Sequence, residues 1–280
     1  MARSQSAALD RKKLMADPIM VTTIVVLITF LTLFILYPLA ILLVDSFVGD
    51  GSFGFGIFER IFAMPTFTKA ITNTLKVGFL VGILSALLGL LFAYVEVYVR
   101  VGKFVGGLFK VVSMLPVVSP PFVLSLSMIM LFGKSGIITR FLLGIYDNSV
   151  YGFWGIAIVS IWQWTGYTMI IYVAGINSIS ADVQEAAMLD GATGLQKFFR
   201  VTLPLIMPSV TICLFWTITR ACTMFDLPFA LAAGGPFRSS ETIAMNIYTE
   251  AFTRNNYGLG SAKAMLFFAA VLIVAQLQVF

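Results

Sequence analysis

The residues Glu185-Ala186-Ala187-Met188-Leu189-Asp190-Gly191, with Val201-Thr202-Leu203-Pro204 after them, form a polar island between two long apolar runs. Acidic residues, a glycine and a proline punctuate this island at short intervals. Apolar runs on both sides indicate that the chain crosses a membrane before and after it. A structured turn in such a connecting loop is typical of a surface that another protein binds.

The composition indicates an integral membrane protein surrounded by a lipid bilayer. Hydrophobic residues make up 59% of the 280 positions and charged residues 11%, and the mean hydropathy is +0.97. A soluble domain has about 25% charged residues. The net charge of +5 fits Lys and Arg gathered on cytoplasmic loops. No basic patch interleaved with aromatic residues points to a nucleic acid partner.

The titratable residues argue against an enzyme and against a metal site. Histidine is absent, which removes the commonest general base and metal ligand. Catalysis within the membrane would need paired acids or a nucleophile with its base at membrane depth, and no such set occurs. Cys213 and Cys222 lie nine residues apart, within or beside one apolar run, and are interpreted as small core residues.

The charge-free intervals predict an all-α polytopic fold with six transmembrane helices. A helix needs about 20 apolar residues to cross the hydrocarbon core. The sixth interval reaches Phe280, so truncation of the chain there remains open. The predicted spans are 18–44, 77–95, 111–133, 152–174, 201–219 and 264–280.

The basic residues favour a cytoplasmic N-terminus. Residues 1–17 are predicted to be a cytoplasmic segment, and the apolar run that follows is too long for a signal peptide. It is therefore expected to remain as an anchor. Lys and Arg are denser in 1–17, 96–110 and 174–200 than in the segments on the other side.

Three prolines interrupt the third predicted span. Pro116, Pro120 and Pro121 cannot all lie in one regular helix without bending it. One interpretation is a kinked helix that lines a pathway, because broken backbone at membrane depth needs protein or water beside it. The other is a span that begins near Pro120, with 111–119 at the interface.

The polar island has the signals of a helix and a turn. Ser180 is placed to cap a helix over 181–190, and Asp182 in its first turn suits the positive end of the helix dipole. Gly191 then lies where a left-handed residue ends a helix. Thr193 and Gln196 have the capping-box spacing for a second helix that leads into the fifth span.

One side of the first helix is rich in small residues that would let another backbone come close, with Glu185 at the rim. This side is predicted to bind a partner, and the alternative is an ordinary loop helix packed on its own protein. Its members are Val183, Ala186, Ala187 and Met188.

These residues resemble the signature loop of the permease subunits of binding-protein-dependent ABC importers. That signature is Glu-Ala-Ala, three residues, Gly, nine residues, then an aliphatic residue, any residue and Leu-Pro. The chain departs from it only in having Val201 where isoleucine is usual. The resemblance covers about residues 20–280, and the loop's place between the fourth and fifth spans also matches.

The resemblance implies a transport subunit of the bacterial inner membrane, with the importer domain over 18–280 and a cytoplasmic coupling loop over 178–204. A coupling helix would sit in a groove of an ATP-binding subunit. The chain has no nucleotide-binding motif, so ATP and Mg would be bound by separate subunits. The implied partners are two ATP-binding subunits, a second permease (homologous or identical) and an extracytoplasmic solute-binding protein. The implied coupling residues are Glu185, Ala186, Ala187, Gly191, Leu203 and Pro204.

The two halves resemble permeases for different solutes. Residues 115–122 and 131–139 resemble ferric-iron permeases. From about Ile161 the chain resembles sugar permeases of the maltose and glycerol-phosphate type, notably at 162–167 and 225–227. Natural divergence and a hybrid of two permease types both remain open.

Chemistry favours a carbohydrate, with ferric iron as the alternative. Iron prefers carboxylate or phenolate oxygens, and no acid lies in the middle of a predicted span. Sugars prefer aromatic faces, amides and hydroxyls. The alternative roles are interfacial belts for Trp and Tyr, and helix packing for Thr. The candidate pathway residues are Gln163, Trp164, Tyr167, Asn177, Thr217 and Asp226.

The outer loop with Gly234, Gly235 and Pro236 is the expected contact for the binding protein, although turn formation explains the same residues. A channel or a secondary transporter is the distant alternative. Such a protein would show intramembrane charges or inverted repeats, and it has no need of the cytoplasmic helix-turn.

Overall fold

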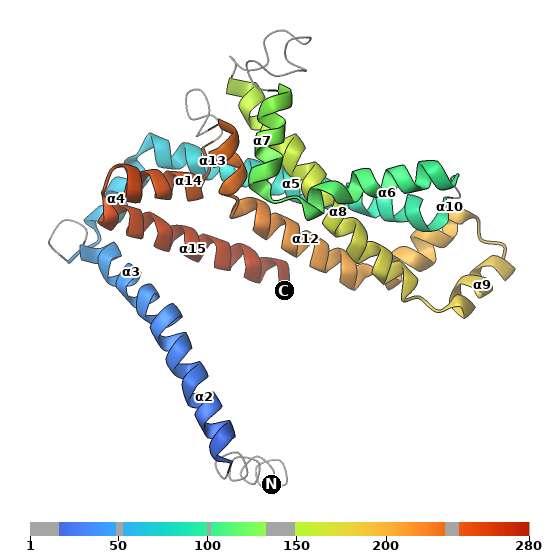
Figure 1. Cartoon of the computed structure of the whole chain (residues 1–280), viewed down its shortest axis with the longest axis horizontal. Helices are drawn as coiled ribbons and strands as arrows, with labels where there is room; N and C mark the ends of the chain where they lie inside the picture. The colour runs from blue at the N-terminus through green and yellow to red at the C-terminus, as the bar shows by residue number, and fades with distance from the viewer. Residues whose placement is uncertain (1–16, 49–52, 100–101, 133–148, 233–240, 280) are drawn as a thin grey trace.

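The computed structural model describes residues 17–48, 53–99, 102–132, 149–232 and 241–279, and these are helical without strands, as predicted (Figure 1). The elements are α2 (Pro18–Leu31), η1 (Thr32–Leu36), α3 (Tyr37–Val48), α4 (Gly56–Ala63), α5 (Pro65–Tyr98), α6 (Lys103–Val118), α7 (Pro121–Phe132), α8 (Ser149–Asn177), α9 (Ala181–Leu189), α10 (Gly194–Lys197), η2 (Phe198–Thr202), α11 (Leu203–Leu205), α12 (Met207–Cys222), α13 (Asp226–Ala232), α14 (Ile243–Tyr248), η4 (Thr249–Thr253) and α15 (Tyr257–Val279).

Five described helical stretches are long and apolar enough to cross a membrane, and a sixth results if α6 and α7 form one bent span. The helices run past the charges that were expected to end the spans. Such charges are Asp45 in α3, Lys76 and Glu96 in α5, Lys110 in α6, Arg200 in η2, Arg220 in α12 and Lys263 in α15. One apolar stretch runs from Met207 to Ala230 through Arg220.

The third predicted span is bent, as expected from its three prolines. Helix α6 begins at Lys103 and continues through Pro116, so the break falls at Pro120 and not at Pro116. The chain bends by 117° between α6 and α7. Ser119, which precedes Pro120, has extended backbone (φ −81°, ψ 130°), because the proline ring disfavours helical geometry in the residue before it.

Helix α5 is the centre of the molecule and packs closely against α8 and α12. A Cβ on Gly82 would meet the Ile218 Cα at 2.9 Å, and one on Gly89 would meet the Met169 nitrogen at 3.0 Å. Small residues allow this approach, and hydroxyls then bond across it. Thr168 Oγ1 donates to the Ser85 carbonyl at 2.9 Å. These glycines were not predicted as contact residues, although the small-residue spacing on α5 was a usable signal.

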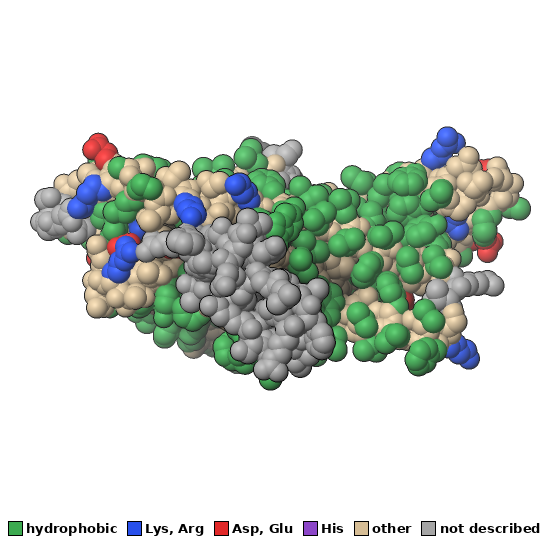
Figure 2. All heavy atoms as spheres, turned by 90° about the horizontal axis from the view of Figure 1, so that it is seen from above, with side chains coloured by type: hydrophobic (Ala, Val, Ile, Leu, Met, Phe, Trp, Pro, Cys, Tyr) green, Lys and Arg blue, Asp and Glu red, His purple; other side chains and the backbone are tan. Residues whose placement is uncertain are grey.

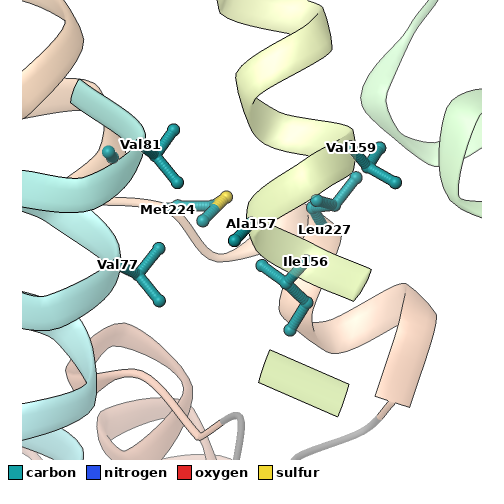
Figure 3. Packing of buried hydrophobic residues seen from close by; sticks show 8 residues of the cluster. Val77, Val81, Ile156, Ala157, Val159, Met224 and Leu227 are labelled. Carbon is teal, nitrogen blue, oxygen red and sulfur yellow. The ribbon is translucent and has the colours of Figure 1, made fainter. Parts of the chain in front are cut away.

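Buried side chains fill the space between α5, α8 and the connection from α12 to α13 (Figure 3). Val77 and Val81 of α5 face Ile156 and Ala157 of α8, with Met224 beside them. The two cysteines are free and buried, which confirms their interpretation as core residues.

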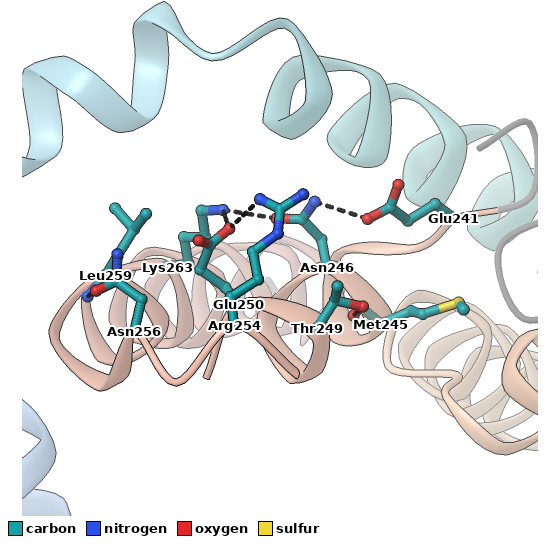
Figure 4. Close-up of polar contacts among 9 residues, drawn as sticks. All are labelled: Glu241, Met245, Asn246, Thr249, Glu250, Arg254, Asn256, Leu259 and Lys263. Atoms are coloured by element: carbon teal, nitrogen blue, oxygen red, sulfur yellow. Dashed lines mark hydrogen bonds and ion pairs between the residues drawn. The ribbon is translucent and has the colours of Figure 1, made fainter. Parts of the chain in front are cut away.

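A buried polar network joins α14 and η4 to α15 (Figure 4). The Lys263 side chain is fully buried, and its Nζ donates to Asn246 Oδ1 and Glu250 Oε2, both at 2.9 Å. Asn246 Nδ2 donates to Glu241 Oε1 at 2.8 Å. Arg254 reaches the same Glu250 oxygen at 3.2 Å from a half-exposed position. The network holds α14 and η4 against α15.

Helix α2 diverges from the rest of the chain, and only its continuation α3 approaches α15 (Figure 1). None of the apolar window within Pro18–Val48 is buried. Ser46 on α3 is buried, and its hydroxyl lies 3.1 Å from the Met265 sulfur. On the face seen in Figure 2, hydrophobic side chains cover most of the right half, between the grey atoms and the charged residues at that tip.

Candidate functional site

The predicted helix-turn lies at one end of the molecule, where α5 and α8 end and α12 begins (Figure 1). Its first helix, α9, ends with the Asp190 nitrogen donating to the Ala186 carbonyl at 3.0 Å. Gly191 follows with φ +75°, which confirms the left-handed ending. The prediction for Ser180 was wrong in one respect, because its side chain makes no capping hydrogen bond although it occupies the N-cap position.

The capping box of the second helix is present as predicted. The Thr193 backbone N–H donates to Gln196 Oε1 at 2.9 Å, and the Gln196 backbone N–H donates to Thr193 Oγ1 at 3.4 Å. The turn between α9 and α10 is therefore fixed by its own side chains.

Aromatic and hydroxyl contacts tie this turn to the end of α5. Tyr94 meets Phe198 edge-on at 4.9 Å between ring centroids, and the hydroxyls of Tyr98 and Thr202 lie 3.0 Å apart. Lys197 Nζ lies 5.5 Å from the Tyr98 ring centroid. A single non-helical residue, Ile206, separates α11 from α12, and it is buried. The turn is thus joined to two long helices.

The predicted side of α9 is exposed except at Ala187. Val183, Ala186 and the rim residue Glu185 are exposed, whereas Ala187 is 8% exposed and packs on its own protein. Leu189 is 89% exposed and Met188 is also exposed. Leu195 and Phe199 on the second helix are exposed as well, and the sequence analysis did not single them out. Together, Met188, Leu189, Leu195 and Phe199 form an exposed apolar surface on a loop that also carries charged residues.

The remaining predicted coupling residues lie where the loop enters the helix bundle. Leu203 is half-buried and packs against a core cluster that includes Ile206, and Pro204 is exposed in the first turn of α11. Proline fits there because a helix's first turn needs no internal N–H bond.

Two of the predicted pathway residues belong to an aromatic cluster at mid-span. The ring centroid of Trp164 lies 5.7 Å from that of Tyr167 and 5.0 Å from that of Trp216, which belongs to α12. The Arg220 guanidinium carbon lies 5.8 Å from the Trp164 centroid and 6.0 Å from the Trp216 centroid. Arg220 was expected only to end a span, and neither Trp216 nor Arg220 was predicted to line the pathway.

The structure does not bring the other pathway candidates to this cluster. Gln163 is 5% exposed, and Thr217 is fully buried with its hydroxyl donating to the Gly82 carbonyl at 3.0 Å. That bond is typical of helix packing. Asn177 is exposed at the end of α8, and exposed Asp226 begins α13.

The expected binding-protein contact at Gly234, Gly235 and Pro236 lies outside the described residues. Within the described part of the chain, no three His, Cys, Asp or Glu side chains are grouped so that they could hold a metal ion.

The chain is similar in sequence to known transport proteins. A family profile described as "Binding-protein-dependent transport system inner membrane component" matches residues 78–280. The starch degradation products transport system permease protein AmyD of Thermoanaerobacterium thermosulfurigenes is 41% identical over 129 residues, which cover 46% of this chain and 44% of AmyD. The ferric transport system permease protein FbpB of Actinobacillus pleuropneumoniae is 29% identical over 95% of this chain and 39% of FbpB.

The fold also matches a solved importer. A bacterial ABC transporter involved in the import of the acidic polysaccharide alginate has a TM-score of 0.82 at 19% identity, over 95% of this chain and 96% of that one. At this identity the likeness shows the fold alone. The matched region spans less than half of the length of AmyD and of FbpB.

Proposed function

Because this chain belongs to the family of inner membrane components of binding-protein-dependent transport systems, we propose that it forms the translocation pathway of an ATP-driven importer. The observation that supports this function most directly is the rigid turn over α9 and α10, with its exposed apolar surface. The chain itself would catalyse no reaction. ATP and Mg would be bound by two separate ATP-binding subunits, and a second permease would complete the pathway.

The proposed orientation places this turn in the cytoplasm, together with the N-terminus. Leu189 and Met188 would enter a groove on an ATP-binding subunit, and burying each would contribute about 1.5–3 kcal/mol. Closure of the ATP-binding subunits would move α9, and the contacts of Tyr94 and Tyr98 would pass that movement to α5. The extracytoplasmic binding protein would meet the opposite end.

Replacing Gly191 by proline is expected to abolish uptake and the ATP hydrolysis stimulated by the binding protein. Proline cannot adopt the observed φ of +75°, so the end of α9 must rearrange. Glu185→Ala should weaken the same coupling. The measurement is uptake and ATPase activity of the assembled importer in proteoliposomes.

Gly194→Ala is the matched control for this test. A Cβ on Gly194 would meet only the Tyr94 hydroxyl, at 3.9 Å, so activity should be retained. If Gly191→Pro and Glu185→Ala both keep full stimulated hydrolysis and uptake, the coupling role is wrong.

We favour a carbohydrate as the cargo, with ferric iron as the alternative. The similarity to AmyD, whose name refers to starch degradation products, supports a sugar, and the mid-span cluster offers the aromatic faces that sugars prefer. The similarity to FbpB supports iron. A hard ferric ion would find no group of three His, Cys, Asp or Glu side chains among the described residues.

The cargo can be decided by the loaded binding protein. Sugar-loaded binding protein is expected to raise the ATPase rate of the reconstituted importer, whereas the iron-loaded form should leave it at the basal rate. The reverse result would establish the iron alternative and end the carbohydrate proposal.

A further inference from the structure

Arg220 holds a charge in the middle of an apolar stretch. It lies near the centre of the span Met207–Ala230, and its side chain is exposed in this chain. None of the described residues forms an ion pair with it. An arginine facing hydrocarbon at this depth costs at least about 2.5 kcal/mol, so intramembrane charges face a water-filled path or a protein neighbour. The surface around Arg220 therefore faces a water-filled path or a neighbouring subunit rather than hydrocarbon.

A second unused polar group lies beside it. The indole N–H of Trp164 is buried without any hydrogen-bond partner, whereas the indole N–H of Trp162 donates to the Val112 carbonyl at 3.2 Å. Buried donors are nearly always paired, so an unpaired one needs an explanation. A ligand oxygen would supply the missing acceptor.

The aromatic rings around Arg220 are arranged so that a sugar ring could pack against them. Trp164, Trp216 and Tyr167 lie within 5.0–5.7 Å of one another, at angles that present both faces and edges. The Tyr167 hydroxyl donates to the Val117 carbonyl of α6 at 3.3 Å, which holds that ring in place. Aromatic faces bind the apolar side of a sugar ring, while a guanidinium binds carboxylate or phosphate through paired N–H groups.

We propose that Arg220, Trp164 and Trp216 form a site in the pathway for a carbohydrate that bears a carboxylate or a phosphate. This inference rests on the proposed carbohydrate importer and names the class of its cargo. Arg220 recognises the anionic group, the rings hold the sugar, and the Trp164 N–H binds one of its oxygens. The cluster joins α8 to α12, so an occupant on these rings would contact two helices that the coupling turn connects.

The test measures binding directly to the whole importer in nanodiscs without ATP. Three radiolabelled probes are compared: digalacturonate, glucose 6-phosphate and the neutral disaccharide maltose. The wild type should bind at least one acidic probe more tightly than maltose. Inorganic phosphate serves as a competitor and should displace these probes only weakly, because it lacks a sugar ring.

Arg220→Gln is expected to raise the Kd for the preferred acidic probe about tenfold to a hundredfold, with little change for maltose. Arg220→Lys keeps the charge and should restore part of the affinity. Lys103→Gln removes an exposed charge at the start of α6 and should change nothing. Size-exclusion chromatography checks that each variant complex is assembled.

Three results would overturn this inference: a wild type that prefers maltose, an Arg220→Gln variant that loses all probes equally, or an Arg220→Gln variant that fails to assemble while Arg220→Lys assembles. The last would identify Arg220 as an interface residue. A preference for maltose would leave the carbohydrate importer standing. Stimulation by the iron-loaded binding protein alone would remove both proposals.

Discussion

Lys263→Met is expected to destabilise the folded chain by about 3–5 kcal/mol, because it leaves Glu250 buried without its nearest cation. The Lys263 ammonium is fully buried and hydrogen-bonded to Asn246 as well, so two acceptors lose their donor together. Thermal unfolding of the purified importer in nanodiscs would measure the loss as a lower Tm.

Arg254→Gln is the matched control, because Arg254 contacts the same Glu250 oxygen from a half-exposed position. Exposed ion pairs contribute about 0–1 kcal/mol, so this variant should unfold close to the wild type. The double variant Lys263→Met with Glu250→Gln should recover part of the lost stability, since the buried Glu250 charge is removed together with its nearest cation. If Lys263→Met unfolds at the wild-type temperature, the network is not a structural support.

Gly89→Leu is expected to prevent the chain from folding and assembling. Even a Cβ at this position would overlap Thr168 Oγ1 and lie 2.7 Å from the Thr168 Cβ and 3.0 Å from the Met169 nitrogen. Because the last contact is with backbone, α5 and α8 must move apart, and their hydrogen bond from Thr168 to Ser85 is lost. The smaller Gly89→Ala change should already cost about 1–3 kcal/mol.

Gly107 provides the comparison for this experiment. A Cβ on Gly107 meets nothing within 4 Å, so Gly107→Ala should leave both the assembled yield and the Tm unchanged. The measurement is the fraction of importer that elutes as a complete complex, followed by its thermal unfolding. Equal behaviour of Gly89→Ala and Gly107→Ala would show that the close approach of α5 and α8 is not required.

The parts of the fold that depend on neighbours in sequence could be predicted. Apolar intervals predicted the transmembrane helices, Gly191 predicted the end of α9, and the spacing of Thr193 and Gln196 predicted the capping box. Each of these features depends on the residue types within one or two helical turns.

The parts that depend on distant residues could not be predicted. Charges were expected to end spans, yet Lys263 lies inside α15, where Glu250 of η4 neutralises its charge and Asn246 of α14 accepts a hydrogen bond from it. Only Trp164 and Tyr167 of the aromatic cluster could be named in advance, because the contact with Trp216 exists only after α8 and α12 pack together.

The burial of Ile206 has a consequence for energy efficiency in the proposed importer. This residue is the sole interruption between α11 and α12, and it is 2% exposed among packed side chains. Because packed side chains surround Ile206, the chain resists bending at this break. The coupling turn and α12 would therefore move together. Each ATP-driven movement of the turn would then move α12 as well. ATP hydrolysis would therefore remain coupled to transport of the cargo.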